Sequence, residues 1–353
     1  MKTVNTGIAG YGNGGRLFNA TIIDSVEGFR ITRIMTTDEN KIAAAREDFP
    51  EAAVVSSFTD IIRDPEIDLV VITTPNHFHL DLAKKALKAG KHVVVEKPFT
   101  VTTEEADELI ELATKKSLVL SVNHNRRWDS DFLTVKKVVE GKKLGEIVDY
   151  EAHFDRFRNE VSNGWKEDKE NPGSGILYDL GSHLIDQALT LFGPPKEIYA
   201  DLRKQRKSAA VHDNFEVLLY YPNLKVTLKA SALVKAKGPT YSLHGTKGSF
   251  SKYGIDSQEE MLKSGLKPNG NWGWGQESQE IWGKLDVLEE SGTVESEIGD
   301  YRKFYQNIYD AITNNADLEV KPEQAREVIR VIELAIKSST EKRVVEYESA
   351  YRD

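Results

Sequence analysis

The chain lacks cysteine altogether: none occurs among its 353 residues. Disulfide bonds, thiolate catalysis and cysteine-based zinc sites are therefore excluded, and the absence is typical of a protein from a reducing compartment. Long apolar runs are also missing, since none approaches the roughly 18 residues that a membrane-spanning helix needs. The first residues lead directly into a glycine-rich turn, so we expect no signal peptide and a cytoplasmic location.

An excess of positive charge is missing as well. The net charge is −9 and the isoelectric point is about 5.6, which argues against nucleic acid or an anionic membrane as a partner. Short basic runs such as residues 203–207 are typical of solvated faces. The hydrophobic content of 39% suits a globular protein, and the length exceeds the usual size of one core. We expect two domains, a dinucleotide-binding domain at residues 1–123 and a substrate-binding domain at residues 124–353.

Segments with strand and helix character alternate through the first third of the chain. Predicted strands occupy residues 4–9, 30–36, 68–73, 92–96 and 119–123, and predicted helices occupy residues 17–26, 39–49, 78–89 and 103–116. The run Leu69–Ile72 is continuously apolar, as expected of a strand that is buried on both faces of a parallel sheet. This alternation predicts a doubly wound parallel sheet of the Rossmann type.

A glycine-rich turn follows the first predicted strand, with Gly10, Gly12 and Gly15 in the spacing G-x-G-x-x-G. Gly10 permits the tight turn, Gly12 lets the backbone approach a pyrophosphate, and Gly15 allows the helix to pack closely on the strand. The N-terminus of that helix offers free N–H groups to phosphates. Alone, the motif also fits an ordinary glycine-rich turn; between a strand and a helix it predicts a dinucleotide site.

The end of the second strand indicates which dinucleotide is bound. Enzymes that prefer NAD usually place an acid there, about 20 residues after the glycines, to bind the ribose hydroxyls. Here the aligned residue is Thr36, followed by Thr37, and hydroxyls can donate to a 2′-phosphate. We therefore predict NADP. NAD stays an alternative, because Asp38 could repel a phosphate or itself serve as the acid.

Two motifs follow later strands and therefore reach the same edge of the sheet. Thr74 and Pro75 follow one strand, and Glu96, Lys97 and Pro98 follow the next. A residue directly before a proline is held extended, so the Lys97 ammonium can project from the end of the sheet towards a nicotinamide. Taken alone, this segment also fits a surface Lys-Pro turn.

A further candidate site lies in Asp179-x-x-x-His183, where two side chains four residues apart share one face of a helix. Histidine titrates near neutral pH, so His183 can accept the proton of an alcohol as hydride leaves the carbon. Asp179 could orient His183 or bind the hydroxyl beside Lys97. The spacing equally fits an Asp/His pair on a helix surface. Asp186 could complete a metal site, but the chain has no H-E-x-x-H pattern, and we predict no metal.

Residues 123–129 end the last strand of the first domain and carry Arg126 and Arg127 beside Trp128. Guanidinium donors and a flat indole suit a polyhydroxylated ring. The two arginines equally fit an ion-pair cluster between domains, because arginine is favoured in both settings.

Together these motifs resemble the glucose–fructose oxidoreductase/inositol dehydrogenase (Gfo/Idh/MocA) family. The resemblance rests on the glycine turn, Thr74-Pro75, Glu96-Lys97-Pro98, Arg126-Arg127 and Asp179-x-x-x-His183, and it spans nearly the whole chain. Residues 123–129, 178–183 and 252–256 are similar to the NADP-dependent scyllo-inositol dehydrogenase branch of the family. Asp38 departs from that branch, which tends to have a basic residue there.

The resemblance implies specific roles for the motif residues. His183 would be the general base, Lys97 would polarise the reacting oxygen and contact the cofactor, and Asp179 would position both. The expected cofactor contacts are Gly10, Gly12, Asn13, Gly15, Thr36, Thr37, Thr74, Pro75, His79, Glu96 and Lys97. The expected substrate contacts are Asn125, Arg126, Arg127, Trp128, Asp179 and His183.

The resemblance also implies a second domain with a large, mostly antiparallel open sheet. Helices would cover one face, and the other face would form a homo-oligomer, either a dimer or a tetramer. Alternation predicts strands at residues 148–158, 197–204, 215–221, 224–234 and 241–244, and helical spacing predicts helices at residues 301–314 and 322–339. The tryptophan-rich segment 267–285 is predicted to be a long loop that acts as a lid, a subunit contact or an ordered surface loop.

We therefore expect an NAD(P)-dependent dehydrogenase that interconverts a secondary alcohol and a ketone on a cyclitol or sugar, with scyllo-inositol and NADP as the leading pair. Two other functions fit the same pattern. One is redox-assisted glycoside hydrolysis with tightly bound NAD, and the other is a nucleotide-sensing regulator that has lost the chemistry. The presence of Lys97 and His183 argues against the regulator.

Overall fold

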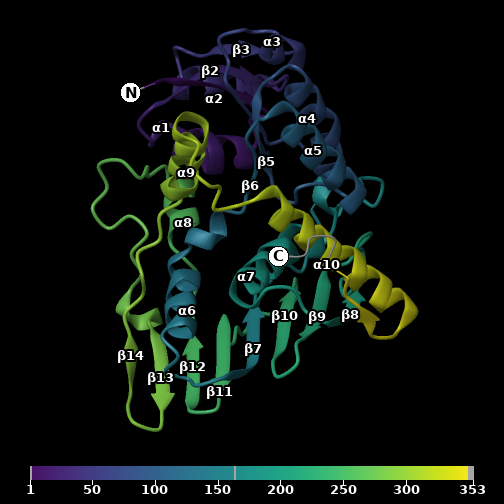
Figure 1. Cartoon of the computed structure of the whole chain (residues 1–353), viewed down its shortest axis with the longest axis vertical. Helices are drawn as coiled ribbons and strands as arrows, with labels where there is room; N and C mark the ends of the chain where they lie inside the picture. Colours follow the sequence, from purple (N-terminus) through teal and green to yellow (C-terminus); the bar gives the residue numbers. More distant parts are fainter. Residues whose placement is uncertain (1, 163, 349–353) are drawn as a thin grey trace. The chain divides into compact units, whose positions relative to one another are not determined.

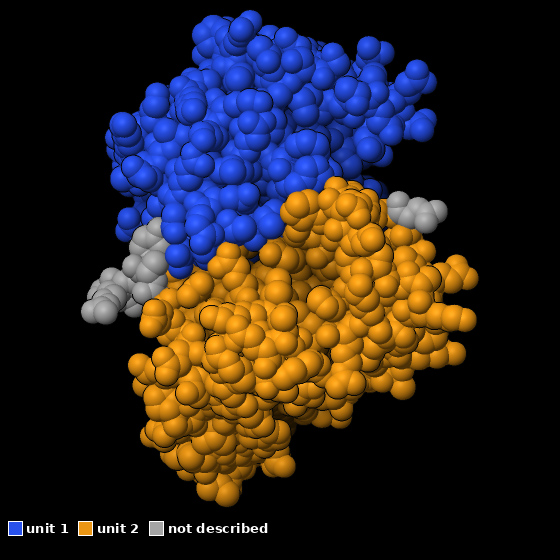
Figure 2. All heavy atoms as spheres, turned by 90° about the vertical axis from the view of Figure 1, so that its right-hand side faces the viewer, with its two compact units in different colours: residues 1–125, 258–274, 300–326 blue, residues 126–257, 275–299, 327–353 orange. Residues whose placement is uncertain are grey.

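A computed structural model describes residues 2–162 and 164–348 of the chain (Figure 1). The chain forms two compact units (Figure 2). Unit 1 comprises residues 1–125, 258–274 and 300–326, and unit 2 comprises residues 126–257, 275–299 and 327–353. Two late segments thus return to the first unit, which nothing in the sequence pattern indicated.

Unit 1 is built on a six-stranded parallel sheet with the order β3-β2-β1-β4-β5-β6. Its strands are β1 (Val4–Ala9), β2 (Phe29–Met35), β3 (Ala53–Val55), β4 (Leu69–Ile72), β5 (His92–Glu96) and β6 (Leu120–Asn123). The predicted Rossmann-type sheet is confirmed. The strand β3 was not predicted, because three residues are too few to show a periodicity. The order reverses between β1 and β4, and open α/β sheets bind ligands at such a point.

The helices of unit 1 surround this sheet. They are α1 (Thr21–Asp24), α2 (Glu39–Asp48), α3 (Phe58–Ile62), α4 (His79–Lys88), α5 (Thr103–Lys116), α8 (Gln258–Lys263) and α9 (Arg302–Asn314), with the short segments η1 (Gly14–Ala20) and η2 (Asn76–Phe78). The helix α5 shows why several were predictable: a capping box joins Thr102 to Glu105, and Ser117 ends the helix in the left-handed conformation. The helix predicted at residues 17–26 instead begins at Gly14, and its first part has π geometry.

Unit 2 is built on a nine-stranded sheet with the order β14-β13-β12-β11-β7-β10-β9-β8-β15 (Figure 1). The strands are β7 (Ile147–His153), β8 (Glu197–Arg203), β9 (Asn214–Tyr220), β10 (Lys225–Ser231), β11 (Tyr241–Gly245), β12 (Gly248–Lys252), β13 (Gly283–Val287), β14 (Ser291–Val294) and β15 (Val345–Glu346). β7 and β10 pair in parallel, and the other pairs are antiparallel. The predicted large, mostly antiparallel sheet is therefore confirmed.

Period-two alternation explains the central strands of this sheet. In β9 the side chains of Phe215, Val217 and Leu219 are buried, whereas those between them are partly exposed. The strands β12 to β15 were not predicted, since they are short and their residues alternate less clearly. The tryptophan-rich segment, predicted as a loop, also contains a helical turn and enters β13 at Gly283.

The remaining helical segments are η3 (Asn125–Trp128), α6 (Ser130–Glu140), η4 (Trp165–Glu167), η5 (Leu177–Gly181), α7 (Ser182–Phe192), η6 (Gln279–Ile281) and α10 (Pro322–Glu341). The helix α7 packs on β10 and on α6. Near the edge of the sheet, the hydroxyls of Ser338 and Ser339 on α10 accept the N–H groups of Ala200 and Leu202, both at 3.0 Å. These bonds satisfy donors of β8 that β15 is too short to reach. None of the helices in the described ranges has the length and apolar character needed to span a bilayer.

A buried acidic cluster joins α6 to later parts of unit 2. The Ser130 N–H donates to Asp256 (2.7 Å), and the Ser130 hydroxyl donates to Glu277 (2.8 Å). Lys252 pairs with Glu277 at 2.6 Å, and both side chains are fully buried. Burial raises the pKa of Asp131 to about 7, with further contributions from the charges of Asp256 and Glu277 that Lys252 only partly opposes.

We predict that Asp131→Asn removes a pH dependence of stability. The unfolded chain releases this proton near pH 4 and the folded chain near pH 7, so folding retains a proton between these values. Stability should therefore fall as pH rises through this window, by up to about 1.4 kcal/mol per pH unit, and then level off. Asparagine cannot ionise, so the variant should lose this slope in urea unfolding at pH 5, 6, 7 and 8. Asp317→Asn, at an exposed carboxylate, serves as the control. Parallel stability curves for the wild type and Asp131→Asn would contradict the prediction.

Candidate active site

The glycine-rich turn lies at the carboxyl end of β1. Gly10 has a φ of +101°, which favours glycine, and its N–H donates to the Met35 carbonyl at 3.0 Å. At Gly15 an added Cβ atom would lie 2.3 Å from the Gly10 carbonyl oxygen, so only glycine fits there. At Gly12 an added Cβ atom would meet nothing within 4 Å. The turn therefore has one closely packed glycine and one open glycine, which suits the approach of a pyrophosphate to the backbone.

The end of β4 lies beside this turn. The Thr73 hydroxyl donates to the Gly10 carbonyl at 2.8 Å and ties the two strand ends together. Among the described residues, the buried Thr74 Oγ1 has no hydrogen-bond partner, and neither does the buried Oδ1 of Asn123 at the end of β6. Buried polar atoms are nearly always paired, so these atoms call for partners from outside the chain. A dinucleotide at this edge of the sheet fits both requirements.

His79, at the start of α4, is buried between two strand-end loops. Its Nδ1 lies 2.9 Å from the Pro98 carbonyl, and its Nε2 lies 2.9 Å from the Thr74 carbonyl. Burial lowers the pKa of this imidazole, and the backbone carbonyls of Thr74, Pro98 and Phe99 partly oppose that shift. The ring thus connects the loop that carries Thr74 and Pro75 to the loop that follows Lys97.

The residues predicted to choose the cofactor follow β2. Thr36 is buried, and its N–H donates to the Val55 carbonyl at 3.1 Å, whereas Thr37 is exposed. Asp38 is the N-cap of α2: its Oδ1 accepts the Lys41 N–H at 3.1 Å. The Lys41 ammonium lies 3.7 Å from the other oxygen of Asp38. The Asp38 carboxylate is therefore engaged by the helix that it begins.

Glu96 and Lys97 lie at the end of β5. The Glu96 carboxylate accepts hydrogen bonds from the side-chain amides of Asn19 (2.6 Å) and Asn123 (2.8 Å). It also accepts the main-chain N–H of Lys97 at 3.2 Å. The peptide bond between Lys97 and Pro98 is cis. The backbone at Lys97 is thus attached to a carboxylate that two other elements hold in place.

Asp179 and His183 come from one helical run in unit 2. Asp179 lies in η5, which has π geometry, and His183 lies in the first turn of α7. Such π turns are rare and are frequent at functional sites. The Lys166 ammonium donates to Asp179 Oδ1 at 2.5 Å. The His183 ring is 6% exposed and meets the Phe154 ring edge to face, with centroids 6.3 Å apart.

The two arginines after β6 make ion pairs within unit 2. Arg126 donates to Asp129 at 2.9 Å, and its guanidinium lies 4.9 Å from the centre of the Phe154 ring. Arg127 binds Asp186 through two parallel bonds of 2.8 and 2.6 Å between nearly buried side chains. These pairs fasten η3 to α6 and α7.

The neighbours of the arginines are also buried. Asn125 is 7% exposed and Trp128 is 5% exposed. The contribution of Asn125, Arg126, Arg127 and Trp128 to substrate binding stays a prediction. In the described residues no group of three or more His, Asp or Glu side chains is arranged to hold a metal ion.

Lys166 was not anticipated from the sequence, because it lies in an irregular segment without a motif. Its carbonyl accepts the Gly175 N–H at 2.8 Å, at the entry to the helical run of Asp179. The next residue, Glu167, binds Arg206 at 3.0 Å, and Arg206 in turn pairs with the buried Asp213 at 2.8 Å. The segment that presents Lys166 to Asp179 is therefore anchored through the Lys166 main chain and the Glu167 side chain.

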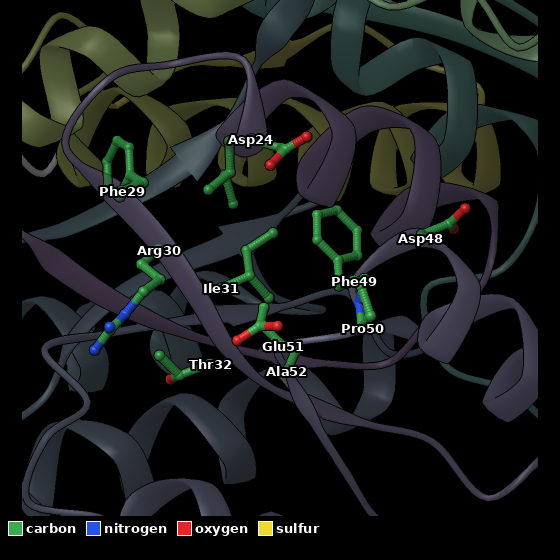
Figure 3. A pocket seen from close by; sticks show the side chains of 11 residues that line it. Asp24, Phe29, Arg30, Ile31, Thr32, Asp48, Phe49, Pro50, Glu51 and Ala52 are labelled. Carbon is green, nitrogen blue, oxygen red and sulfur yellow. The ribbon is translucent and has the colours of Figure 1, made fainter.

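A separate cavity of about 520 Å³ lies along β2, near the ends of α1 and α2 (Figure 3). Phe29, Ile31 and Phe49 contribute apolar surface, and Arg30 and Glu51 contribute charge. None of the residues predicted to bind cofactor or substrate lines it. The predicted site therefore does not depend on this cavity.

Both halves of the chain match known families. Residues 4–124 match the model of the oxidoreductase family's NAD-binding Rossmann fold, and residues 136–347 match that of the oxidoreductase family's C-terminal alpha/beta domain, both from the Gfo/Idh/MocA group. Scyllo-inositol 2-dehydrogenase (NADP(+)) IolW of Bacillus subtilis (strain 168) is 42% identical over 349 residues, which cover 98% of this chain and 96% of that protein. The uncharacterized oxidoreductase YdgJ of Escherichia coli (strain K12) is 44% identical over 341 residues, which cover 95% and 96%.

Solved structures agree with these matches. The oxidoreductase yvaA of Bacillus subtilis has a TM-score of 0.94 at 42% identity, over 98% of this chain and 99% of that one. An oxidoreductase of Klebsiella pneumoniae has a TM-score of 0.90 at 39% identity, over 100% and 97%. The resemblance seen in the motifs is confirmed: the chain belongs to the Gfo/Idh/MocA family of oxidoreductases and carries that family's NAD-binding Rossmann domain.

Proposed function

We propose that the chain is a dehydrogenase that interconverts a secondary alcohol and a ketone on a cyclitol or sugar, with scyllo-inositol and NADP as the leading pair. The observation that carries this proposal is the 42% identity to IolW across nearly the full length of both chains. The arrangement of Asp179 and His183 on one helical run, with a cation on Asp179, supports it.

The proposed chemistry divides between the two motifs. A dinucleotide held at the glycine-rich turn of Gly10, Gly12 and Gly15 would supply the acceptor for the hydride of the substrate carbon. His183 takes the proton of the substrate hydroxyl as the carbonyl forms, and it returns that proton in the reverse direction. The Lys97 ammonium donates to the reacting oxygen and favours its developing negative charge. The proposal requires both groups to reach the same hydroxyl.

Asp179 is proposed to position the proton-transfer groups. Its carboxylate is held by the Lys166 ammonium at 2.5 Å. A charge-assisted hydrogen bond of this kind fixes the direction of the carboxylate. From this fixed position, Asp179 is proposed to orient a hydroxyl of the substrate or the His183 ring.

The proposed preference for NADP rests on the residues after β2. Thr36 and Thr37 offer hydroxyls where NAD enzymes usually have an acid. The Asp38 carboxylate caps α2 and lies near the Lys41 ammonium, so it is engaged within the chain. The relative IolW is named for its use of NADP.

We also propose a homo-oligomer, a dimer or tetramer, formed through the sheet of unit 2. On β7 the side chains of Tyr150 and Ala152 are buried, whereas Glu151 and His153 on the opposite face are partly exposed. His153 lies 2.6 Å from Glu151 and 2.9 Å from Asp155. Burial opposes its protonation, but the hydrogen bonds to these two acids raise the pKa of His153 overall. A face on which acidic side chains are paired with a histidine suits contact with a second copy of the chain better than contact with lipid.

The function is tested by a spectrophotometric screen of inositols and other sugars with NADP and NAD in parallel. Reduction of NADP by scyllo-inositol is the expected result. Turnover without added nicotinamide cofactor would instead favour redox-assisted glycoside hydrolysis. In the same assay Lys97→Ala and His183→Ala should each lower kcat by about 10²- to 10⁴-fold, the usual range for loss of acid–base catalysis, while cofactor binding persists. Full activity in both variants would refute the mechanism.

We predict that Thr36→Asp reverses the cofactor preference. A carboxylate at this position would repel a 2′-phosphate and could bind the ribose hydroxyls of NAD. The ratio of kcat/KM for NADP to that for NAD should fall by about tenfold or more, because the loss of one favourable contact and the gain of one repulsion together exceed about 1.4 kcal/mol. Thr36→Val, which removes the hydroxyl without adding charge, should weaken NADP alone. A clear preference of the wild type for NAD would overturn this interpretation of Thr36.

We predict that Lys166→Met lowers kcat/KM by about tenfold, because Asp179 loses the donor that fixes its carboxylate. Lys169→Met is the matched control, since Lys169 lies in the same loop and, within the described residues, pairs with the exposed Glu170. The loss should be much smaller when it is measured in an Asp179→Asn background, because the two residues act through one interaction. Equal losses in both backgrounds would show that Lys166 acts independently of Asp179.

A further inference from the structure

A network of side chains within unit 1 surrounds the carboxylate that precedes Lys97. Glu96 Oε1 accepts from Asn19 (2.6 Å) and from Asn123 (2.8 Å), and Glu96 Oε2 accepts the Lys97 N–H (3.2 Å). These donors come from η1, from the end of β6 and from the peptide unit of Lys97 itself. Three segments that are distant in the sequence therefore meet at one half-buried carboxylate.

Asn19 is the centre of this network. It is fully buried in the π turn that follows the glycine-rich turn. Its amide nitrogen donates both to Glu96 and to the Gly14 carbonyl (2.8 Å). Its Oδ1 accepts the Tyr305 hydroxyl and, at 3.3 Å, the Asn123 amide. Every hydrogen-bonding group of the Asn19 side chain is thus in use, so the amide has a single favourable orientation.

Tyr305 reaches this network from α9, 286 residues further along the chain. The contact between α1 and α9 brings that helix alongside the start of unit 1 (Figure 1). The Tyr305 side chain is 1% exposed, and its ring meets the Phe29 ring edge to face at 6.0 Å. Burial and the negative charge of Glu96 raise the pKa of Tyr305 well above its ordinary value. The hydroxyl therefore stays protonated and always offers its hydrogen to Asn19.

A structural requirement alone does not explain these polar groups. Burying a carboxylate and an amide is costly unless each finds partners, and an apolar cluster would pack the same space without that cost. The network does what an apolar cluster cannot: it attaches the main chain of Lys97 to the helix that begins at the glycine-rich turn. An added Cβ at Gly14 would lie 4.0 Å from Glu96 Cγ, so the two segments are in close contact.

We propose that Tyr305 and Asn19 are positioning residues for Lys97, an inference that rests on the proposed function of that lysine. Tyr305 orients the Asn19 amide, Asn19 orients the Glu96 carboxylate, and Glu96 holds the N–H of Lys97. The phosphate-binding turn and the lysine then move as one body. Neither Tyr305 nor Asn19 touches the reacting atoms in this scheme, and both act through Glu96.

The test compares Tyr305→Phe with Tyr309→Phe. Both tyrosines lie on α9, both rings pack against Phe29, and each hydroxyl donates one hydrogen bond, since that of Tyr309 goes to the Lys2 carbonyl at 2.8 Å. Each substitution removes a single oxygen from a buried ring, so the variants are matched in size and in lost bonds. Thermal unfolding curves of the two variants are the check that both fold.

Two readouts are expected to separate the variants. In the protein without cofactor, hydrogen–deuterium exchange of peptides that cover residues 92–99 should become faster in Tyr305→Phe and stay unchanged in Tyr309→Phe. In steady-state assays, kcat of Tyr305→Phe should fall by about tenfold, because small displacements of a reacting group are costly, while the KM for cofactor changes by less than about threefold. Tyr309→Phe should retain the wild-type kcat.

The outcomes distinguish this inference from the proposed function. If Tyr305→Phe leaves either the exchange or kcat at the wild-type value, the positioning role is overturned. If the wild type turns over no alcohol in the screen, the proposed function fails, and faster exchange in Tyr305→Phe alone would still establish the attachment of the Lys97 segment to α9. If both variants exchange faster to the same extent, the effect belongs to the packing of α9 and the inference is refuted.

Discussion

The register of the parallel sheet in unit 1 determines which side chains can meet at its carboxyl edge. Ala9 pairs with Ile72, Ile72 pairs with Val95, and Glu96 pairs with Asn123. The strands β1, β4, β5 and β6 therefore end at nearly the same level, and the segments that follow them emerge together. A shift of one residue in any pair would turn the side chains at that strand end to the opposite face. The contacts of the glycine turn, His79 and Glu96 all depend on this register.

The polar groups gathered at that edge must then be satisfied, because water reaches few of them. The Thr73 hydroxyl donates to the Gly10 carbonyl, and the His79 ring lies between the carbonyls of Thr74 and Pro98. The side-chain amides of Asn19 and Asn123 donate to the Glu96 carboxylate. In unit 2 an ion pair between side chains meets the same requirement. Arg127 binds Asp186 and so holds the segment that precedes α6 against α7. These contacts, which position the motif residues predicted to be functional, lie within one unit in each case.

Local signals allowed much of the fold to be predicted. The glycine spacing, the apolar run of β4 and the alternation of strand and helix segments are local signals, and the sheet and helices they indicate are present. Short strands such as β3 and β14 were missed because their few residues carry no clear period. Local motifs singled out Lys97, Asp179 and His183, the family resemblance implied their roles, and those roles stay a proposal.

What the sequence could not indicate depends on distant partners. The contact of Tyr305 with Asn19 joins residues 286 positions apart, and no pattern within α9 marks that hydroxyl as different from that of Tyr309. Lys166 likewise lies in the short helical turn η4, which carries no motif, and its position follows from the anchoring of Glu167 on Arg206. The π geometry of η1 and η5 was also hidden, since both sequences read as ordinary helix starts.

The two carboxylates nearest the proposed chemistry are held by different physical means. Glu96 is half-buried and accepts hydrogen bonds from the neutral amides of Asn19 and Asn123 and from the Lys97 N–H. Asp179 accepts a hydrogen bond from the ammonium of Lys166, and that side chain is 49% exposed. Dissolved ions screen an exposed ion pair strongly and a buried amide bond hardly at all. We therefore expect the bond between Lys166 and Asp179 to weaken more with rising ionic strength than the bonds from the Asn19 and Asn123 amides to Glu96.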